Sequence, residues 1–279
     1  MKRFFQLLTA VLMITFALPT FAKTYTLAIP LHAWHSHQSD ANILKYYTPL
    51  QKWLEQQTGY QFKLVGYRAN TTAAKQLAKG KYSIAYMKAM AFLNAKKRNP
   101  NVTALATVTT WNASHTRKII SYSGFLLTLK TNTQIKTIHD LKNKKIAFVD
   151  PFSASGFLYP VSILKYHNID YQTFFKKHYF LVNHVNVLNA ILDGKVAAGF
   201  VWGGAWSNSP NKNKFKSLMV IPNIPNPLFA ASGKLSQEAK MKIQKALIAT
   251  PESVTKGLVF VGFAKTPKNY YEQVHSLDL

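Results

Sequence analysis

The 279-residue sequence contains no cysteine, so no disulfide stabilises the fold, and the small disulfide-built scaffolds of many secreted proteins are excluded. The chain is long enough to bury one large core or two medium ones instead. It also lacks a Gly-x-Ser-x-Gly elbow, a Walker Gly-rich Lys loop and paired carboxylates near any cleft motif. We therefore expect no enzymatic activity and no cofactor.

Acidic residues are scarce, with 10 Asp and Glu against 35 Lys and Arg, and the formal net charge is +25. The lysines are spread through helix-like segments and include Lys75, Lys79, Lys81 and Lys88. No cluster resembles a reading helix or a stacking platform, so nucleic acid is not an expected partner. A solvated basic surface is one interpretation, and attraction to anionic ligands, acidic membrane partners or envelope polymers is the other.

A long apolar run occurs only near the N-terminus. Lys2 and Arg3 precede an apolar stretch from Phe4 to Leu18, and Thr20-Phe21-Ala22 resembles a cleavage site, which together predict a signal peptide over residues 1–22. A membrane anchor is the alternative, but the stretch is short and is broken by polar residues. No cysteine follows it, so a lipoprotein is excluded, and we expect an exported, periplasmic protein.

The rest of the chain alternates short apolar strands with amphipathic helices, which is typical of an α/β fold with a largely parallel sheet. The expected strands include 24–29, 102–108 and 197–202, and the expected helices are 43–57, 184–192 with a cap at Gly194, and 236–249 and 251–258 near the C-terminus. A β-rich stretch over 118–129 and a triple-proline stretch over 221–227 interrupt this alternation. Two interruptions predict two crossings between lobes. The expected domains are a discontinuous first lobe, 23–117 plus 226–279, and a second lobe, 118–225.

One stretch, Asp150 to Pro160, has the residues of an anion-binding helix start. It follows an apolar strand and contains Ser153, Ser155 and Gly156, so backbone N–H groups and hydroxyls are available to an anion, and glycine permits close approach. An ordinary serine-capped helix is the alternative interpretation.

Several segments in order resemble the periplasmic solute-binding proteins of ABC importers for phosphate, phosphite and phosphonates. They are residues 80–86 (GKYSIAY), 139–148 (HDLKNKKIAF), 150–160 (DPFSASGFLYP) and 224–227 (IPNP). The resemblance implies a two-lobed, type II periplasmic binding fold with a two-strand hinge that closes over its ligand. It also implies an ABC permease as partner, and we expect a monomer.

In that family the run similar to Ser153-Ala154-Ser155-Gly156 supplies hydroxyls and helix amides to the phosphonyl oxygens, so the resemblance assigns these four residues to the ligand. Ala154 stands where the family usually has Thr. Phe92 stands where a Tyr hydroxyl is expected, and we predict that Phe92 contacts the ligand. The acids that hold a ligand ammonium are missing from residues 194–204. The resemblance therefore transfers the fold better than the substrate.

A histidine-rich loop, His32 to His37, follows the first expected strand and also contains Trp34 and His35. Three histidines are able to gather a metal or to present donors to an anion, and a solvated loop is the third possibility. The spacing is not a specific zinc pattern, so no metal site is expected. We predict that Trp34 and His35 contact the ligand, Trp34 by stacking on an organic substituent.

Four further residues follow expected strands at positions where a cleft is expected. Arg68, next to Tyr67, suits a bidentate pair with a phosphoryl or carboxylate group, and a surface arginine is the alternative. His184 begins a helix, and Trp202 ends a strand before two glycines. We predict ligand contact for all four, with a structural role as the alternative for His184 and core packing as the alternative for Trp202.

These observations predict the solute-binding component of an ABC importer. Its ligand is expected to be a small anion, a phosphonate-like or phosphate-like oxyanion with room for an organic substituent. The alternative is a ligand-sensing or envelope-interaction module with the same fold and an aromatic, non-phosphonate ligand. An esterase with Ser153 as nucleophile and His184 as base is a third reading, but no orienting acid stands at a recognisable position.

Overall fold

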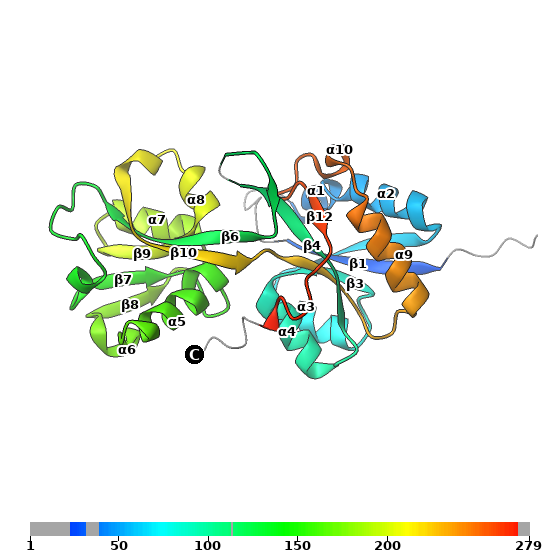
Figure 1. The fold of residues 1–279 in the computed structure, drawn as a ribbon, viewed down its shortest axis with the longest axis horizontal. Coiled ribbons are helices and arrows are strands. Elements are labelled where there is room, and N and C mark those ends of the chain that lie inside the picture. Colours follow the sequence, from blue (N-terminus) through cyan, green and yellow to red (C-terminus); the bar gives the residue numbers. More distant parts are fainter. Residues whose placement is uncertain (1–22, 32–38, 113, 273–279) are drawn as a thin grey trace, which may run out of the picture.

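The computed structural model describes residues 23–31, 39–112 and 114–272. They form two α/β lobes side by side along the longest axis of the molecule, each with its own sheet (Figure 1). The predicted two-lobed α/β fold is therefore confirmed. The predicted signal peptide, Trp34 and His35 lie outside the described residues. Among the described residues, no helix combines the length and apolar character needed to cross a membrane.

The sheet of the first lobe has the order β12-β4-β11-β3-β1-β2, with β5 added beside β4. Its strands β1, β2 and β3 are parallel, and β11 lies antiparallel between β3 and β4. The bounds are β1 (Thr24–Pro30), β2 (Gln61–Tyr67), β3 (Ile84–Met87), β4 (Thr103–Trp111), β5 (Lys118–Ile119), β11 (Leu228–Ala231) and β12 (Gly262–Ala264). The sequence reading expected only helices after the triple-proline stretch and missed the short strands β11 and β12.

Two helical layers cover this sheet. One buried cluster includes residues of α2 and α9, and another includes residues of α3 and α4. The bounds are α1 (Asp40–Lys45), α2 (Thr48–Thr58), α3 (Asn70–Ala78), α4 (Ala89–Arg98), α9 (Gln237–Ile248) and α10 (Glu252–Thr255). A single helix was expected over 43–57. The chain instead starts a new helix at Thr48, because Pro49 fits the first turn of a helix but not its interior.

The sheet of the second lobe has the order β10-β6-β9-β7-β8. Strands β7, β8 and β9 are parallel, while β6 runs antiparallel to β9 and β10. The bounds are β6 (Ser121–Leu129), β7 (Lys145–Phe148), β8 (Lys177–Phe180), β9 (Ala198–Trp202) and β10 (Phe215–Pro225). Part of the triple-proline stretch belongs to β10. This is an edge strand whose register shifts between Ile221 and Ile224, and edges and bulges tolerate proline.

The helices of the second lobe lie on both faces of its sheet (Figure 1). The bounds are η1 (His139–Leu141), η2 (Ala154–Leu158), α5 (Tyr159–Tyr166), α6 (Tyr171–Phe174), α7 (His184–Leu192), α8 (Gly203–Ser207) and η3 (Lys212–Lys214). The sequence predicted α7 with these limits. Its end is set by Gly194, whose φ of +66° lies in the left-handed region that favours glycine.

The chain crosses between the sheets at Ile120 and at Asn226. Strand β6 leads from Ile120 into the second lobe, and strand β10 leads back to Asn226 (Figure 1). The Asn226 N–H donates to the Ile120 carbonyl at 2.9 Å. The Asn226 carboxamide donates to the carbonyls of Val108 and Ile119 at 3.0 and 3.1 Å. One buried side chain therefore ties both crossings to the first sheet.

Two tyrosines near the end of the described chain also contact the crossings. The Tyr270 hydroxyl donates to the Ile120 carbonyl at 2.7 Å, and the Tyr271 hydroxyl donates to the Asn226 carbonyl at 2.8 Å. Each crossing segment is thus held by a hydroxyl from the same pair of neighbouring residues.

Candidate ligand-binding site

Three groups of candidate residues follow the carboxyl ends of the parallel strands β7, β8 and β9. Ser153 to Gly156 come after β7, His184 comes after β8, and Trp202 ends β9. Carboxyl ends of parallel strands lie at one edge of a sheet, where ligands of open α/β sheets bind. The fold therefore brings these six predicted residues to the same edge.

The turn after β7 sets the position of the helix start. Asp150 accepts twice: its carboxylate from the Phe152 N–H at 2.8 Å and its carbonyl from the Ser153 N–H at 3.0 Å. An aspartate that accepts from the amide two residues on is typical of such a turn. Ser153 is consequently held in an extended conformation immediately before η2.

Ser153 is the N-cap of η2, and the first turn of this helix is a wide, π-helical turn. The Ser153 hydroxyl accepts from the Gly156 N–H at 3.2 Å, while its carbonyl accepts from both Phe157 and Leu158 at 3.0 Å. Among the described residues, no backbone carbonyl pairs with the N–H groups of Ala154 and Ser155. Amides at a helix start carry partial positive charge, and the Ala154 amide in particular is suited to an anion.

Gly156 packs tightly, and this packing explains the glycine. An added Cβ would lie 2.4 Å from Val149 Cγ2 and 2.8 Å from the Ser153 hydroxyl oxygen. The Gly156 carbonyl also accepts from the Val149 N–H at 3.2 Å. The sequence interpretation of this glycine was close approach by a ligand. The structure supplies a different cause, contact with the end of β7, and a ligand role for Gly156 stays a prediction.

Tyr122 of β6 lies beside the helix start and was not predicted. Burial raises the pKa of its phenol to about 12, and hydrogen bonding from the side chain and backbone of Ser155 offsets part of that rise. Ser155 itself is buried and approaches β6 closely, because an added Cβ on Gly124 would lie 3.1 Å from the Ser155 Cβ. Tyr122 is therefore an un-ionised hydroxyl next to the candidate anion site.

His184 is held as a neutral ring. Its Nδ1 accepts from the Trp202 N–H at 3.2 Å, so in the neutral ring Nε2 carries the proton. Burial, and secondly the charge of Lys88, lower the pKa of His184 to about 3. The Trp202 ring lies edge-on to the rings of His184 and Tyr122, each 6.4 Å away between centroids. His184 thus offers a hydrogen-bond donor without a positive charge.

The loop that delivers His184 contains a strained residue. Val182 has a φ of +73°, and the N–H of Asn183 donates to the carbonyl of Leu181 at 2.9 Å, which defines a γ-turn of the rare type. The left-handed region is unfavourable for a β-branched residue. The Val182 side chain is 77% exposed, so burial of its own side chain does not repay this strain.

Lys88 of the first lobe lies close enough to His184 to help lower its pKa, and it was also missed. It precedes α4 directly after β3, and its side chain is half-buried. Burial lowers the pKa of its ammonium, and Asp150 of the second lobe partly opposes this. The sequence reading placed Lys88 among solvated lysines. Its position after a buried parallel strand, the signal used for Arg68, was the clue that could have found it.

The other predicted residues of the first lobe have contacts within that lobe. The buried Tyr67 hydroxyl donates to the Tyr86 carbonyl at 2.7 Å, and the exposed Arg68 pairs with Asp40 at 2.6 Å. Phe92 is buried edge-to-face against Tyr271, with centroids 5.5 Å apart. None of these contacts reaches η2, and ligand roles for the three residues stay predictions.

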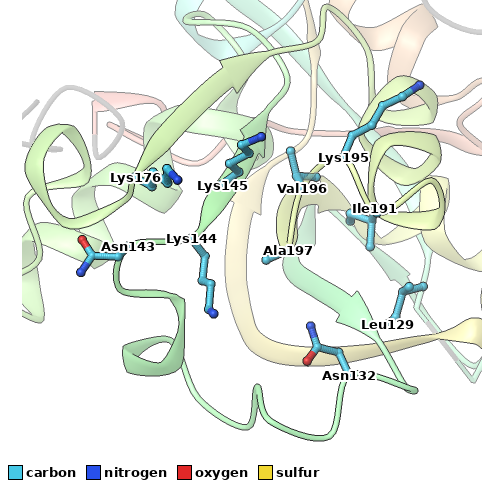
Figure 2. A pocket seen from close by; sticks show the side chains of 11 residues that line it. Leu129, Asn132, Asn143, Lys144, Lys145, Lys176, Ile191, Lys195, Val196 and Ala197 are labelled. Atoms are coloured by element: carbon cyan, nitrogen blue, oxygen red, sulfur yellow. The ribbon is translucent and has the colours of Figure 1, made fainter.

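A cavity of about 390 Å³ lies at the opposite end of the second lobe. Its lining includes the start of β7 and residues just before β8 and β9, so it is at the amino ends of the strands whose carboxyl ends carry η2, His184 and Trp202. Figure 2 shows four lysine side chains around it, Lys144, Lys145, Lys176 and Lys195. All four are exposed, and Lys195 pairs with Asp193 at 2.8 Å, so this is a solvated basic surface.

Comparison with known proteins identifies the family. Residues 32–271 match the family described as "ABC transporter, phosphonate, periplasmic substrate-binding protein". The chain is 29% identical over 143 residues to the phosphate-import protein PhnD of Mycolicibacterium smegmatis, a match that covers 51% of this chain and 41% of that protein.

Two solved structures are similar in fold. PhnD1 of Prochlorococcus marinus, in complex with methylphosphonate, aligns with a TM-score of 0.72 at 16% identity, over 91% of this chain and 97% of the other. A binding protein component of an ABC phosphonate transporter from Pseudomonas aeruginosa aligns with a TM-score of 0.70 at 22% identity, over 92% and 86%. With most of its length matched by the family model, the chain belongs to the periplasmic substrate-binding proteins of phosphonate ABC transporters.

Proposed function

We propose that the protein is the solute-binding component of an ABC importer and that it binds a small phosphorus oxyanion by closure of its two lobes. The Ala154 amide at the start of η2, which donates to no backbone carbonyl among the described residues, is the observation that carries the ligand class. Family membership supports the transport role, as do the names of relatives that import phosphate or bind methylphosphonate.

The oxyanion is held at the start of η2. Its oxygens accept from the Ala154 amide and from Nε2 of His184. Ser155 adds its hydroxyl and amide, which it shares with the Tyr122 hydroxyl. Charge-assisted hydrogen bonds of this kind contribute about 1.5–3 kcal/mol each. Ser153 shapes the turn, because its hydroxyl already accepts from Gly156. An organic substituent packs against the Trp202 ring and, in the loop outside the described residues, against Trp34 and His35.

The remaining features belong to the same proposal. Residues 1–22 are a cleaved signal peptide without a lipid anchor, and the mature protein is a periplasmic monomer that delivers its ligand to an ABC permease. It binds without catalysing a reaction. The first lobe comprises 23–117 plus 226–279 and the second 118–225, and the bond between Asn226 and Ile120 supports a hinge at this level.

Calorimetry on the mature chain tests the ligand class. The panel is phosphate, phosphite, methylphosphonate, methanesulfonate and aromatic heterocycles, with thermal shifts as a second readout. A ligand at 100 times its Kd stabilises the folded state by about 2.7 kcal/mol. We expect phosphorus oxyanions to bind. Binding of a heterocycle without any phosphorus oxyanion would overturn the proposal and leave the family unchanged.

Two substitutions at one residue test the site. Ala154→Pro deletes one amide donor at the first helical position, where proline is tolerated, and Ser153 before it is already extended. We expect affinity to fall at least tenfold while the melting temperature changes little. Ala154→Thr is the matched variant, because it adds a hydroxyl and is expected to tighten binding. Equal affinity in all three proteins would place the ligand elsewhere.

A further inference from the structure

Lys88 belongs to the first lobe and lies between Met87 and Ala89, two residues of a buried cluster that contacts Tyr159 of the second lobe. It occupies the last position before α4, with extended backbone angles, and follows the buried residue Met87 at the carboxyl end of β3. The two groups that its charge affects, Asp150 and His184, both belong to the second lobe. Lys88 therefore lies on the side of the first lobe that meets the second, within electrostatic reach of Asp150 and His184.

The Lys88 ammonium is not paired with an acidic side chain among the described residues. Among the described residues Lys88 makes no ion pair or hydrogen bond, although five other basic residues form ion pairs with acids. Asp150 is the acid whose charge acts on the pKa of Lys88, and its carboxylate already accepts a hydrogen bond from the Phe152 amide. A half-buried cation without a partner is unfavourable, and an anion bound between the lobes removes that cost.

The surrounding groups carry little negative charge. The helix start offers amides and hydroxyls, and His184 is a neutral donor. The stretch 194–204 has Lys195 and otherwise uncharged residues. An ammonium on the ligand would therefore meet Lys88 with Asp150 as the one carboxylate, in the described part of the chain, whose charge acts on that lysine. A doubly charged ligand gains about twice the attraction to Lys88 that a singly charged one gains.

We infer that Lys88 is the specificity-determining residue of the site: its ammonium selects dianionic phosphorus oxyanions without an amino group over sulfonates and aminoalkylphosphonates. This inference rests on the proposed function and names its substrate class. Phosphate, alkylphosphonates and small phosphate monoesters meet the requirement.

The experiment compares Lys88→Met with Lys145→Met, using calorimetry with methylphosphonate, methanesulfonate and 2-aminoethylphosphonate. Lys145 is the matched control, since the same positive charge is lost at the far end of the second lobe. At a pH where methylphosphonate is a dianion, we expect Lys88→Met to weaken it at least tenfold and methanesulfonate less than threefold. Lys145→Met should change each affinity less than twofold.

Two further variants complete the test. Lys88→Gln keeps a polar head and is used if the methionine variant does not fold, with the same expected loss. Lys88→Glu should reverse the preference and favour 2-aminoethylphosphonate over methylphosphonate. Unchanged selectivity in Lys88→Met while Ala154→Pro loses binding would overturn the inference and keep the proposed function. A wild-type protein that binds no phosphorus oxyanion would overturn the proposed function itself.

Discussion

The backbone N–H of Asn226 donates to the carbonyl of Ile120 at 2.9 Å and so joins the two crossings of the chain. The Asn226 carboxamide adds bonds to Val108 and Ile119. Replacement by alanine leaves two carbonyls without these donors, and an unsatisfied buried polar group costs about 1–3 kcal/mol. We expect Asn226→Ala to lower the free energy of unfolding by about 2–4 kcal/mol in urea titrations.

A control for this prediction is Asn189→Ala on the exposed face of α7, which should change stability by less than about 0.5 kcal/mol. An Asn226→Ala protein as stable as the wild type would show that the carboxamide bonds do not hold the crossings.

Gly156→Ala tests the contact between η2 and β7. The new Cβ would lie 2.4 Å from Val149 Cγ2, so either the side chain or the helix start must shift. Overpacking of this kind costs about 1–3 kcal/mol. Thermal unfolding should show that loss. The double variant Gly156→Ala, Val149→Ala should lose less than the sum of the two single changes, because the smaller side chain makes room.

Val182→Gly should stabilise the protein. Glycine adopts the φ of +73° without the steric cost that valine meets, and such strain is worth about 1–3 kcal/mol, against a backbone-entropy cost of glycine of roughly 0.5–1 kcal/mol. We expect a net gain of about 1 kcal/mol in denaturant unfolding. The matched control is Val185→Gly, in the first turn of α7, which should instead lose about 0.5–1 kcal/mol. A destabilised Val182→Gly would argue against strain at this turn.

His184 should make stability depend on pH. Because its pKa is lowered to about 3 in the fold, the unfolded chain binds a proton below pH 6.5 that the folded chain does not. This contribution is fully present above pH 6.5 and is lost as the pH falls toward 3, with a slope of at most about 1.4 kcal/mol per pH unit. His184→Asn keeps an acceptor for the Trp202 N–H but does not titrate. Its stability should fall less than that of the wild type between pH 6.5 and 4.5, and parallel curves would contradict the prediction.

The sequence predicted the architecture well where local patterns decide it. The helical pattern and the cap at Gly194 predicted α7 correctly. The apolar strand patterns placed β1, β4 and β9 within a few residues of their observed ranges. Short strands such as β12 were missed because three residues carry no periodicity. Part of the triple-proline stretch was read as a connection, yet Pro222 lies in an edge strand, where the missing N–H is tolerated.

The site was harder to predict than the fold, because its chemistry depends on which lobe a side chain faces. Ser153 to Gly156 were recognisable from strand, serines and glycine in one stretch. Lys88 looks in the sequence like any other surface lysine, and only the opposing lobe distinguishes it. Tyr122 lies within a strand and meets Ser155 through tertiary packing, which no local pattern indicates.

Tyr159, the first residue of α5, packs against buried residues of both lobes, including cores on either side of the cleft. Any widening of the cleft must give one side of this ring to water, at about 25 cal/mol for each Å² of apolar surface exposed. The Tyr159 hydroxyl is buried without a hydrogen-bond partner among the described residues, so opening would also hydrate this group and offset part of that cost. The same side chain therefore opposes opening through its ring and favours it through its hydroxyl.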